Sequence, residues 1–478
     1  MNGQLSSASA EATQASVSAA VEADKSALPL LRSERTWGSW KLGISLATAA
    51  AATWCYLIGG YVGAYLPFLS GSISLSAGCM IGMLLVALAV VPVCMRFGVD
   101  SIASVKPQFG NRGWVLVSAM QFISIVGWNS LLLIFFAKST TQLLLALGVI
   151  QDGSGALLVP MTILLACSLV FCFLLKGSSG VDRVAKILVV HVLVGFWMLY
   201  IIVSQRWDEL ASAVPASASP DRLWNYTTGV EIGIASLLSW WPYMGAMVRM
   251  APKGRTAALP IMLGMSAPVP ALSLIGIAGV LVLQVSDPSE WLRSIGGPTY
   301  GIVALLFVAA ANLGTAVAGV YASAIGLQHF KALERLSWPA ILLITILPVA
   351  LVGLIIPELF FANFGTFLAF IGVGFAPLCG IQIADYYLMR RRRIVVRALY
   401  ENGPDSPYRF WLGVNPAAVL AMAAGCATYV VLLDPLTYES HGPYAFTTAS
   451  LPSVLVAAVV YCLLTRLWIM PANKGGYR

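Results

Sequence analysis

Two tryptophan clusters stand in the middle of long apolar segments. One reads Gly127-Trp128-Asn129, and the other reads Ser239-Trp240-Trp241-Pro242-Tyr243-Met244-Gly245. Trp128 offers a flat π face, and the amide of Asn129 can both donate and accept, a pair that suits a planar heteroaromatic ring with hydrogen-bonding edges. A packed aromatic residue beside an amide that bonds a neighbouring helix explains Trp128 and Asn129 equally well.

The second cluster predicts a break in its helix. Pro242 lacks a backbone donor and clashes with the preceding turn, while Gly245 permits unusual backbone dihedral angles. Secondary transporters use interrupted helices to present carbonyl groups and helix ends to their substrates. An ordinary proline kink is the simpler interpretation, but Trp240 and Trp241 lie mid-segment, away from the membrane interface where tryptophans usually gather.

Three polar residues inside apolar segments are further candidates. Glu231 precedes the tryptophan pair, and an acid within a membrane is a functional candidate because its charge is costly to bury. Its roles include proton carrier, vestibule residue and helix-start acid. Thr315 lies on a face of small residues that favours close helix packing and could also offer a hydroxyl to a cation. Asn312, on the same segment, is a candidate for substrate contact.

The segments that hold these residues predict an all-α polytopic membrane protein. The chain of 478 residues is 59% hydrophobic and 10% charged, whereas soluble proteins carry about 25% charged residues. Continuous apolar runs of about 20 residues favour helices over the alternating strands of a barrel. Twelve transmembrane helices are expected, near 41–66, 73–95, 114–136, 156–175, 187–204, 227–248, 259–283, 300–327, 338–356, 361–383, 412–433 and 450–468.

Basic residues predict the orientation of the chain. Most lysines and arginines of the short loops fall on the side of the N-terminus, and Lys138, Arg206, Arg222 and Arg293 fall on the other. We therefore expect both termini in the cytoplasm and the chain in the plasma (inner) membrane. The net charge of +8 then reflects topology rather than nucleic-acid binding. The arginine run 390–393 is expected to anchor the chain at the membrane surface.

One transporter domain is expected over residues 37–470, between a disordered cytoplasmic tail, 1–36, and a cytoplasmic tail, 471–478. The sequence has no phosphate-binding loop and no cysteine or histidine cluster, so we expect no ATPase, no zinc site and no cofactor. A channel would show charged rings or a filter motif, and an embedded enzyme would need partners for the isolated His191. The expected partners are a small molecule, the lipid bilayer and a coupling cation, with the chain as a monomer.

Three stretches resemble the nucleobase:cation symporter-1 family of cytosine, purine, allantoin and hydantoin permeases. They are Arg-Ser-Glu-Arg-Thr-Trp-Gly at 32–38, Phe-Gly-Asn-Arg-Gly at 109–113 with the following Gly127-Trp128, and 376–387, which matches P-L-x-G-I-x-x-x-D-Y-[FY]. The resemblance covers nearly the whole chain. It implies a leucine-transporter-like fold of two inverted repeats, about 41–204 and 227–383, with extra helices about 412–468. It also implies import of a small planar nitrogen heterocycle by cation symport with alternating access.

The resemblance also implies site residues. An aromatic residue of the third span, here Trp128, and one of the sixth, here Trp240 or Trp241, would enclose the ring. Adjacent helical residues point about 100° apart, so one of that pair would face the ligand. Asn129 and Asn312 complete the expected substrate contacts. The sodium site of sodium-coupled members falls on Thr48, Ala51, Ala311, Gly314 and Thr315.

The chain departs from the family pattern at positions that bear on coupling and substrate. Gly314 stands where a hydroxyl is common, which weakens a site for a hard cation, so coupling to sodium and coupling to protons through Glu231 both stay open. Ala246 replaces an aspartate of the sixth span, and the eighth span has alanine and valine where polar residues often read base edges. A thiamine-precursor pyrimidine or another heterocycle with proton coupling is therefore the alternative, and a channel or facilitator is less favoured.

Overall fold

The computed structural model describes residues 28–477 except 152, 154, 176–192, 252–256, 328–329, 331–332, 334, 402 and 404. Within these residues the regular elements are helices, accompanied by two isolated β-bridges. Most of the expected N-terminal tail lies outside the described residues. Its last part is described and contains a short 3₁₀ helix, Arg32–Glu34.

Eight helical segments among the described residues are long and apolar enough to cross a membrane. They contain α4 (Phe68–Phe97), α6 (Trp114–Ala146), α7 (Gly155–Leu174), α12 (Ala258–Ser266) with α13 (Pro268–Leu283), α14 (Pro288–Gly296) with α15 (Ile302–Leu327), α16 (Trp338–Ile355), α18 (Phe364–Ile383) and α21 (Ser450–Leu464). The bent pair α2 (Ser39–Ala50) and α3 (Trp54–Tyr65) gives a ninth. Shorter apolar helices are Leu193–Gln205 and α19 (Pro416–Leu432). The expected sixth segment holds α10 (Arg222–Leu238) and α11 (Trp241–Val248), so helix is found in each expected segment.

The first span of each expected repeat is broken. The axes of α2 and α3 differ by 62°, with residues 51–53 between them. In the sixth span, Ser239 and Trp240 separate α10 from α11. Pro242 lies in the first turn of α11. Backbone N–H groups in the first turn have no acceptor within the helix, so proline, which lacks this group, is tolerated there. The break expected from the second tryptophan cluster is therefore present.

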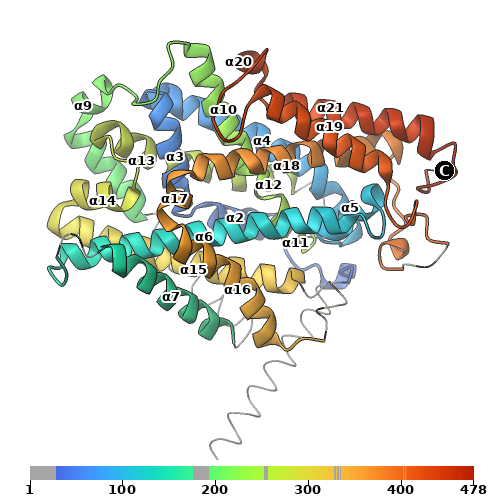
Figure 1. Cartoon of the computed structure of the whole chain (residues 1–478), viewed down its shortest axis with the longest axis horizontal. Coiled ribbons are helices and arrows are strands. Elements are labelled where there is room, and N and C mark those ends of the chain that lie inside the picture. The colour runs from blue at the N-terminus through green and yellow to red at the C-terminus, as the bar shows by residue number, and fades with distance from the viewer. Residues whose placement is uncertain are drawn as a thin grey trace, which may run out of the picture.

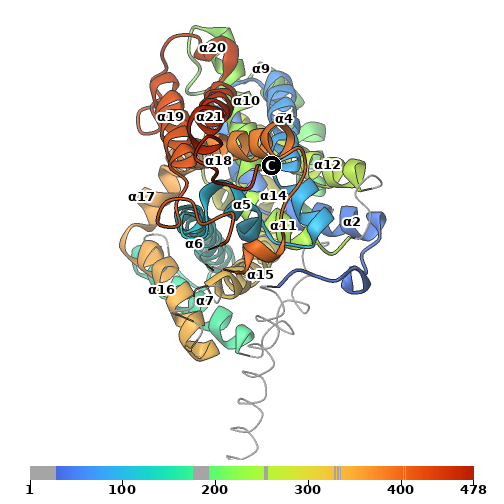
Figure 2. The same cartoon turned by 90° about the vertical axis from the view of Figure 1, so that its right-hand side faces the viewer.

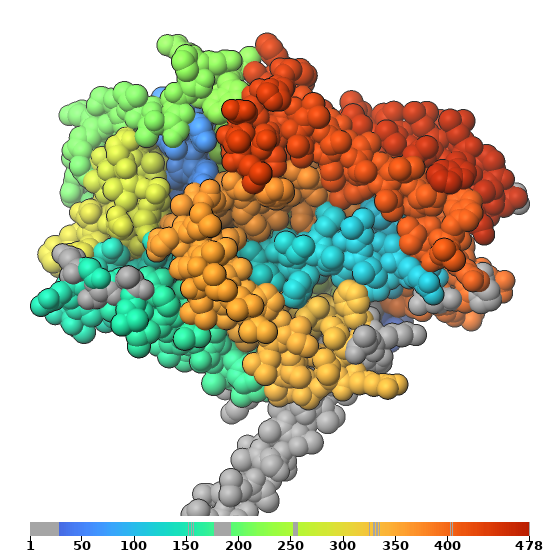
Figure 3. All heavy atoms as spheres, viewed as in Figure 1, coloured from blue at the N-terminus to red at the C-terminus, as the bar shows by residue number. Residues whose placement is uncertain are grey.

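The remaining helices surround α6. In Figures 1 and 2, α7, α15 and α16 lie below α6, while α18, α19 and α21 lie above it. The helices α19 and α21, which contain most of the expected extra segment, pack on each other and on α18. Figure 3 shows α17 (Pro357–Ala362) lying across α6 on one face. The loop helix α5 (Ser101–Phe109) and the C-terminus lie at one end of the molecule, and α9 (Trp207–Ser212) and α14 at the other (Figure 1).

Glycines bring helix backbones into contact at the centre of the bundle. A Cβ atom on Gly59 of α3 would overlap the carbonyl oxygen of Ser273 in α13, and one on Gly276 of α13 would overlap the carbonyl oxygen of Tyr56. A Cβ atom on Gly78 of α4 would likewise overlap a carbonyl oxygen of α10. Small residues allow this close approach between membrane helices, and any larger side chain would force the helices apart.

A buried ion pair fixes the end of the tenth span. The Nε atom of Arg390 lies 2.7 Å from Oδ2 of Asp385, and both side chains are at most 1% exposed. Gln108 and the hydroxyl of Tyr461 also donate to Asp385, at 2.9 and 2.8 Å. The expectation that the whole run 390–393 is a surface anchor is therefore wrong for Arg390, since only residues 391–393 are exposed. A carboxylate five residues earlier in the chain keeps this arginine inside the protein.

Candidate substrate site

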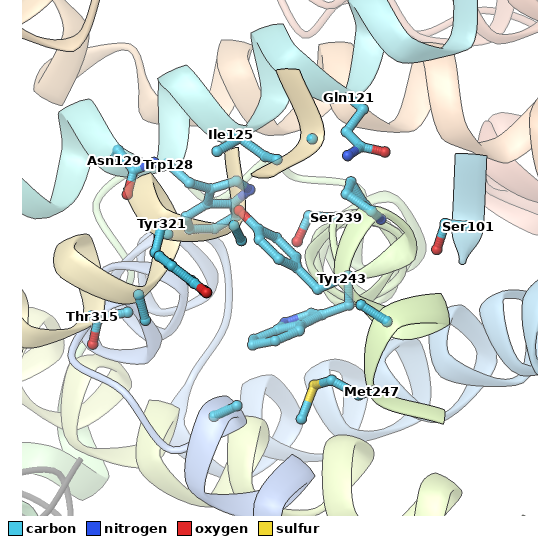
Figure 4. A pocket seen from close by; sticks show the side chains of 18 of the residues that line it. Ser101, Gln121, Ile125, Trp128, Asn129, Ser239, Tyr243, Met247, Thr315 and Tyr321 are labelled. Atoms are coloured by element: carbon cyan, nitrogen blue, oxygen red, sulfur yellow. The ribbon is translucent and has the colours of Figure 1, made fainter. Parts of the chain in front are cut away.

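A cavity of about 440 Å³ lies among four parts of the bundle. These are the broken span α2–α3, the broken span α10–α11, helix α6 and helix α15. This volume is within the range typical of small-molecule sites. Its aromatic lining residues are Trp54, Trp128, Trp240, Tyr243 and Tyr321 (Figure 4). Its polar lining residues are Asp100, Ser101, Gln121, Asn129, Ser239, Arg249 and Thr315. The other lining residues are apolar or glycine.

Three tryptophan rings meet in this lining. Trp54, the first residue of α3, lies edge-on to Trp128 of α6, with ring centroids 5.4 Å apart. It also lies 6.2 Å from Trp240, which is 5.6 Å from Tyr243 of α11. Because aromatic rings attract other π systems through both faces and edges, the arrangement suits a flat ring enclosed from several directions.

The side chains of the two neighbouring tryptophans in the sixth span point in different directions. Trp240 lines the cavity, whereas Trp241 is fully buried and is absent from the lining. The Nε1 atom of Trp241 donates to Oε1 of Gln382 at 2.6 Å, and its ring packs 5.7 Å from Phe375. A rotation of about 100° per residue separates the two rings. Trp241, named as a substrate contact from the sequence, therefore does not lie at the cavity.

Three lining residues of α6 carry buried polar atoms without a hydrogen-bond partner in the described part of the chain. They are Nε1 of Trp128, Nδ2 of Asn129 and Oε1 of Gln121. An unpaired buried polar group costs about 1–3 kcal/mol, so most such groups are paired in folded proteins. All three residues belong to α6. Two donors and one acceptor on this helix are thus available to a ligand.

Asn312 lies outside the cavity lining, unlike the expectation from the sequence. Its side chain is fully buried and accepts a hydrogen bond from the hydroxyl of Thr53, in the break of the first span. Its Nδ2 atom donates to the carbonyl oxygen of Val308 at 3.0 Å. The amide of Asn312 therefore joins α15 to the α2–α3 break.

Only some of the residues expected to bind a cation line the cavity. Gly314 and Thr315 line the cavity, whereas Thr48, Ala51 and Ala311 do not. The hydroxyls of Thr48 and Thr315 each donate to the carbonyl oxygen four residues earlier, both at 2.9 Å. A donating hydroxyl keeps lone pairs that a cation can use. Ala51 is the C-cap of α2, two residues before Thr53, whose hydroxyl donates to Asn312 of α15.

Glu231 is buried away from the cavity and caps a distant helix. One carboxylate oxygen accepts from the hydroxyls of Tyr429 and Ser450, at 2.8 and 2.5 Å. The other accepts from the backbone nitrogens of Ala449 and Ser450, both at 3.1 Å. These two amides lie at the start of α21, where a negative charge is stabilised. Glu231 thus lies neither in an open vestibule nor among the residues that line the cavity.

Trp54 and Gln121 are among the lining residues that the sequence analysis does not single out. Trp54 follows a break that no proline or glycine marks, so its position was not visible in the residue pattern. Gln121 precedes Trp128 by seven residues, which places both on one face of a helix. That spacing was a usable signal for Gln121.

The cavity extends toward the end of the molecule that carries α5. Asp100 and Arg249 line it at that end. Away from that end, Phe364 and Phe367 at the start of α18 pack against Trp128, with ring centroids 5.5 and 5.7 Å apart. The aromatic side chains of α18 thus cover the tryptophan site on the side remote from α5.

Comparison with known proteins decides the family. A family model described as "Permease for cytosine/purines, uracil, thiamine, allantoin" matches residues 29–454. The chain belongs to the nucleobase:cation symporter-1 family. The resemblance inferred from the sequence is therefore confirmed, and the protein is a transporter of this family rather than an enzyme.

The curated relatives match over part of their length. A hydantoin permease of Microbacterium maritypicum is 38% identical over 86 residues, which cover 18% of this chain and 17% of that protein. The purine-uracil permease NCS1 of Arabidopsis thaliana is 27% identical over 202 residues, which cover 40% of this chain and 32% of the relative. The aligned stretches thus span less than a third of each relative.

Solved structures show the fold. The inward-facing conformation of Mhp1 superposes with a TM-score of 0.77 and 19% identity, covering 92% of this chain and 94% of that one. Mhp1 in a closed conformation with bromovinylhydantoin bound gives 0.72, also at 19% identity, with 92% and 95% covered. A sodium-coupled sialic acid symporter gives 0.59 at 11% identity, with 95% and 96% covered. The expected multi-pass, leucine-transporter-like fold is therefore confirmed.

Proposed function

We propose that the protein imports a small planar nitrogen heterocycle by cation symport with alternating access. The observation that carries this proposal is the meeting of Trp54, Trp128 and Trp240 around a cavity at the helix breaks. Stacking of one base on an aromatic side chain contributes about 1–3 kcal/mol. Rings from three different spans supply that contact area.

The polar atoms of α6 favour a ring with both acceptor and donor edges. Carbonyl or ring-nitrogen acceptors would pair with Nε1 of Trp128 and Nδ2 of Asn129, and a ring N–H would pair with Oε1 of Gln121. Cytosine, purines, allantoin and hydantoin all carry such edges. The relatives named hydantoin permease and purine-uracil permease support this class. A thiamine-precursor pyrimidine is the second candidate, since the family description includes thiamine.

Sodium is the favoured coupling ion. Gly314 and Thr315 line the cavity, and the hydroxyl of Thr315 has lone pairs to offer. We propose that Thr48, Ala51 and Ala311 supply further oxygens. Glu231 gives little support to proton coupling because both of its oxygens are used to cap α21.

The basic residues give the proposed orientation. The end of the molecule with α5 carries Arg96, Lys106, Arg249 and Arg390. We place this end in the cytoplasm, with both termini, since basic residues gather on that side of a membrane. In this orientation the cavity extends toward the cytoplasm and the chain lies in the plasma membrane. A monomer contains every residue that lines the cavity.

Uptake into proteoliposomes tests the proposal. A thermal-shift screen of cytosine, uracil, hypoxanthine, allantoin, hydantoin and thiamine-precursor pyrimidines first selects a ligand. Initial uptake is then measured with a sodium gradient alone, a pH gradient alone and no gradient. We expect saturable uptake that the sodium gradient accelerates. Uptake that follows the pH gradient alone would favour proton coupling, and non-saturable flux without response to either gradient would contradict symport.

A further inference from the structure

A chain of buried polar side chains lies behind the tryptophan pair and joins three elements. Nε1 of Trp241 in α11 donates to Oε1 of Gln382 in α18 at 2.6 Å. Nε2 of Gln382 donates to Oγ of Ser104 in α5 at 3.1 Å. Ser104 in turn donates to the carbonyl oxygen of Ser101 at 2.6 Å. The side chains of all four residues lie in the protein interior, at most 3% exposed.

Ser101 contacts the first turn of α11 through two hydrogen bonds. Its hydroxyl accepts from the backbone nitrogen of Gly245 and donates to the carbonyl oxygen of Trp241, both at 2.9 Å. The two backbone groups are four residues apart, so one hydroxyl binds both ends of a single helical turn. A Cβ atom on Gly245 would overlap the backbone nitrogen of Ser101. Glycine at this position therefore permits the contact between α5 and α11.

The rotation of α11 about its axis decides which tryptophan faces the cavity. The helix has 8 residues and is joined to α10 by a turn, in which the backbone nitrogens of Ser239 and Trp240 donate to Ala235 and Leu237. Trp240 lines the cavity, and its ring contacts the rings of Trp54 and Tyr243. Aromatic rings attract one another in several geometries, so these contacts do not fix the position of the Trp240 ring. Trp241, by contrast, is held by a directional hydrogen bond in a fully buried position. The fixed residue of the pair is thus the one outside the cavity.

We propose that Gln382 is a positioning residue for substrate binding, which holds Trp241 and so directs the ring of Trp240 into the cavity. The inference rests on the proposed function, because it assigns Trp240 to the ligand. A glutamine amide can accept from Trp241 and donate to Ser104 at the same time. Leucine has a similar size but forms neither hydrogen bond, so Gln382→Leu removes the contact while keeping the volume.

The contact between α5 and α18 does not depend on Gln382 alone. One turn further along α5, Nε2 of Gln108 donates to Oδ2 of Asp385 at 2.9 Å. Asp385 lies in the π-helical turn Ala384–Met389 that follows α18, so this second contact joins α5 to the end of the same span without touching Trp241. Gln108→Leu is therefore a matched control, with the same residue change in a neighbouring contact of α5.

Ligand binding gives the first test. Binding of cytosine, uracil, hypoxanthine, allantoin and hydantoin is measured by thermal-shift titration for the parent, Gln382→Leu, Trp241→Phe and the double variant. We expect each single change to weaken binding by about three- to tenfold, the range of one hydrogen bond. The double variant should bind no more weakly than the worse single variant, because both changes remove one interaction. Gln108→Leu should bind as the parent does.

Hydrogen exchange of the peptide covering residues 239–248 gives a second test without any ligand. We expect faster exchange of this peptide in Gln382→Leu and parent-like exchange in Gln108→Leu. If a folded Gln382→Leu variant shows parent-like exchange and parent-like affinity, the positioning role is wrong. Faster exchange in both variants would assign Gln382 a merely structural role and overturn the inference. If the parent binds no compound of the panel, the proposed function fails, while exchange still decides whether Gln382 positions α11.

Discussion

Replacing Glu231 tests whether this acid is structural or carries protons. The carboxylate accepts four hydrogen bonds, two from hydroxyl groups and two from the backbone at the start of α21. In Glu231→Gln, the amide oxygen can take the two backbone donors, since hydroxyl groups can rotate to accept from the new NH₂ group. The variant therefore keeps the geometry and loses the charge. In Glu231→Ala, the backbone donors of Ala449 and Ser450 lose their partner.

The expected magnitudes follow from these contacts. Hydrogen bonds to an ionised group are roughly twice as strong as neutral ones, so Glu231→Gln should cost about 1–3 kcal/mol of unfolding free energy. Glu231→Ala leaves at least two buried amides unpaired and should cost about 2–6 kcal/mol. An unfolding entropy of about 2 cal/mol/K per residue converts 1 kcal/mol to about 1 °C if all 478 residues unfold together. The melting temperature should thus fall by about 1–3 °C in Glu231→Gln and by about 2–6 °C in Glu231→Ala.

Thermal unfolding in detergent and gradient-driven uptake are measured on the same preparations. We expect the stability order parent, Glu231→Gln, Glu231→Ala, with unchanged dependence of uptake on the ion gradients in the glutamine variant. Tyr429→Phe serves as a control that removes one donor and leaves the charge in place. A glutamine variant that melts like the parent but no longer responds to a pH gradient would refute the reasoning and make Glu231 a proton carrier.

Three further predictions concern the cavity. Trp128→Ala should weaken ligand binding about tenfold or more in a thermal-shift titration, and unchanged affinity in a folded variant would contradict its role. Trp240→Ala should reduce affinity more than Trp241→Phe in the same titration, and the reverse order would show that the face assignment is wrong. Thr315→Ala removes a hydroxyl oxygen and should raise the sodium concentration for half-maximal uptake. Gly314→Ser adds a hydroxyl oxygen and should lower that concentration. Sodium-independent uptake by the parent would disprove both expectations.

The membrane segments could be predicted because hydropathy is a local property of about 20 residues. One helix break was equally local, since Pro242 marks it. The break between α2 and α3 was not predictable in this way. The residues from Ala49 to Ala52 are alanines, which favour helix, and the break is accompanied by a hydrogen bond between Thr53 and Asn312, 259 residues away. Tertiary contact outweighs local preference at this point.

The site was predictable in type but not in its details. The sequence indicates which helices carry aromatic residues, whereas the rotation of each helix depends on partners far along the chain. Trp241 bonds a residue 141 positions away, and the carboxylate of Glu231 bonds Ser450, 219 positions away. Polar residues in apolar segments are candidates for function and for buried hydrogen bonds alike. The sequence alone cannot separate these two roles.

The glycine contacts at the centre of the bundle determine which tryptophans can move together. Because Gly59 and Gly276 leave no gap between α3 and α13, and Gly78 leaves none between α4 and α10, these helices cannot slide past one another without losing contact. The four helices also contact one another across the pairs. Trp54 begins α3 and Trp240 follows α10, so both travel with this block, whereas Trp128 stays with α6, which packs on α15 and α7. A bound ring would therefore contact both groups of helices at once, and a change in their separation would change its affinity.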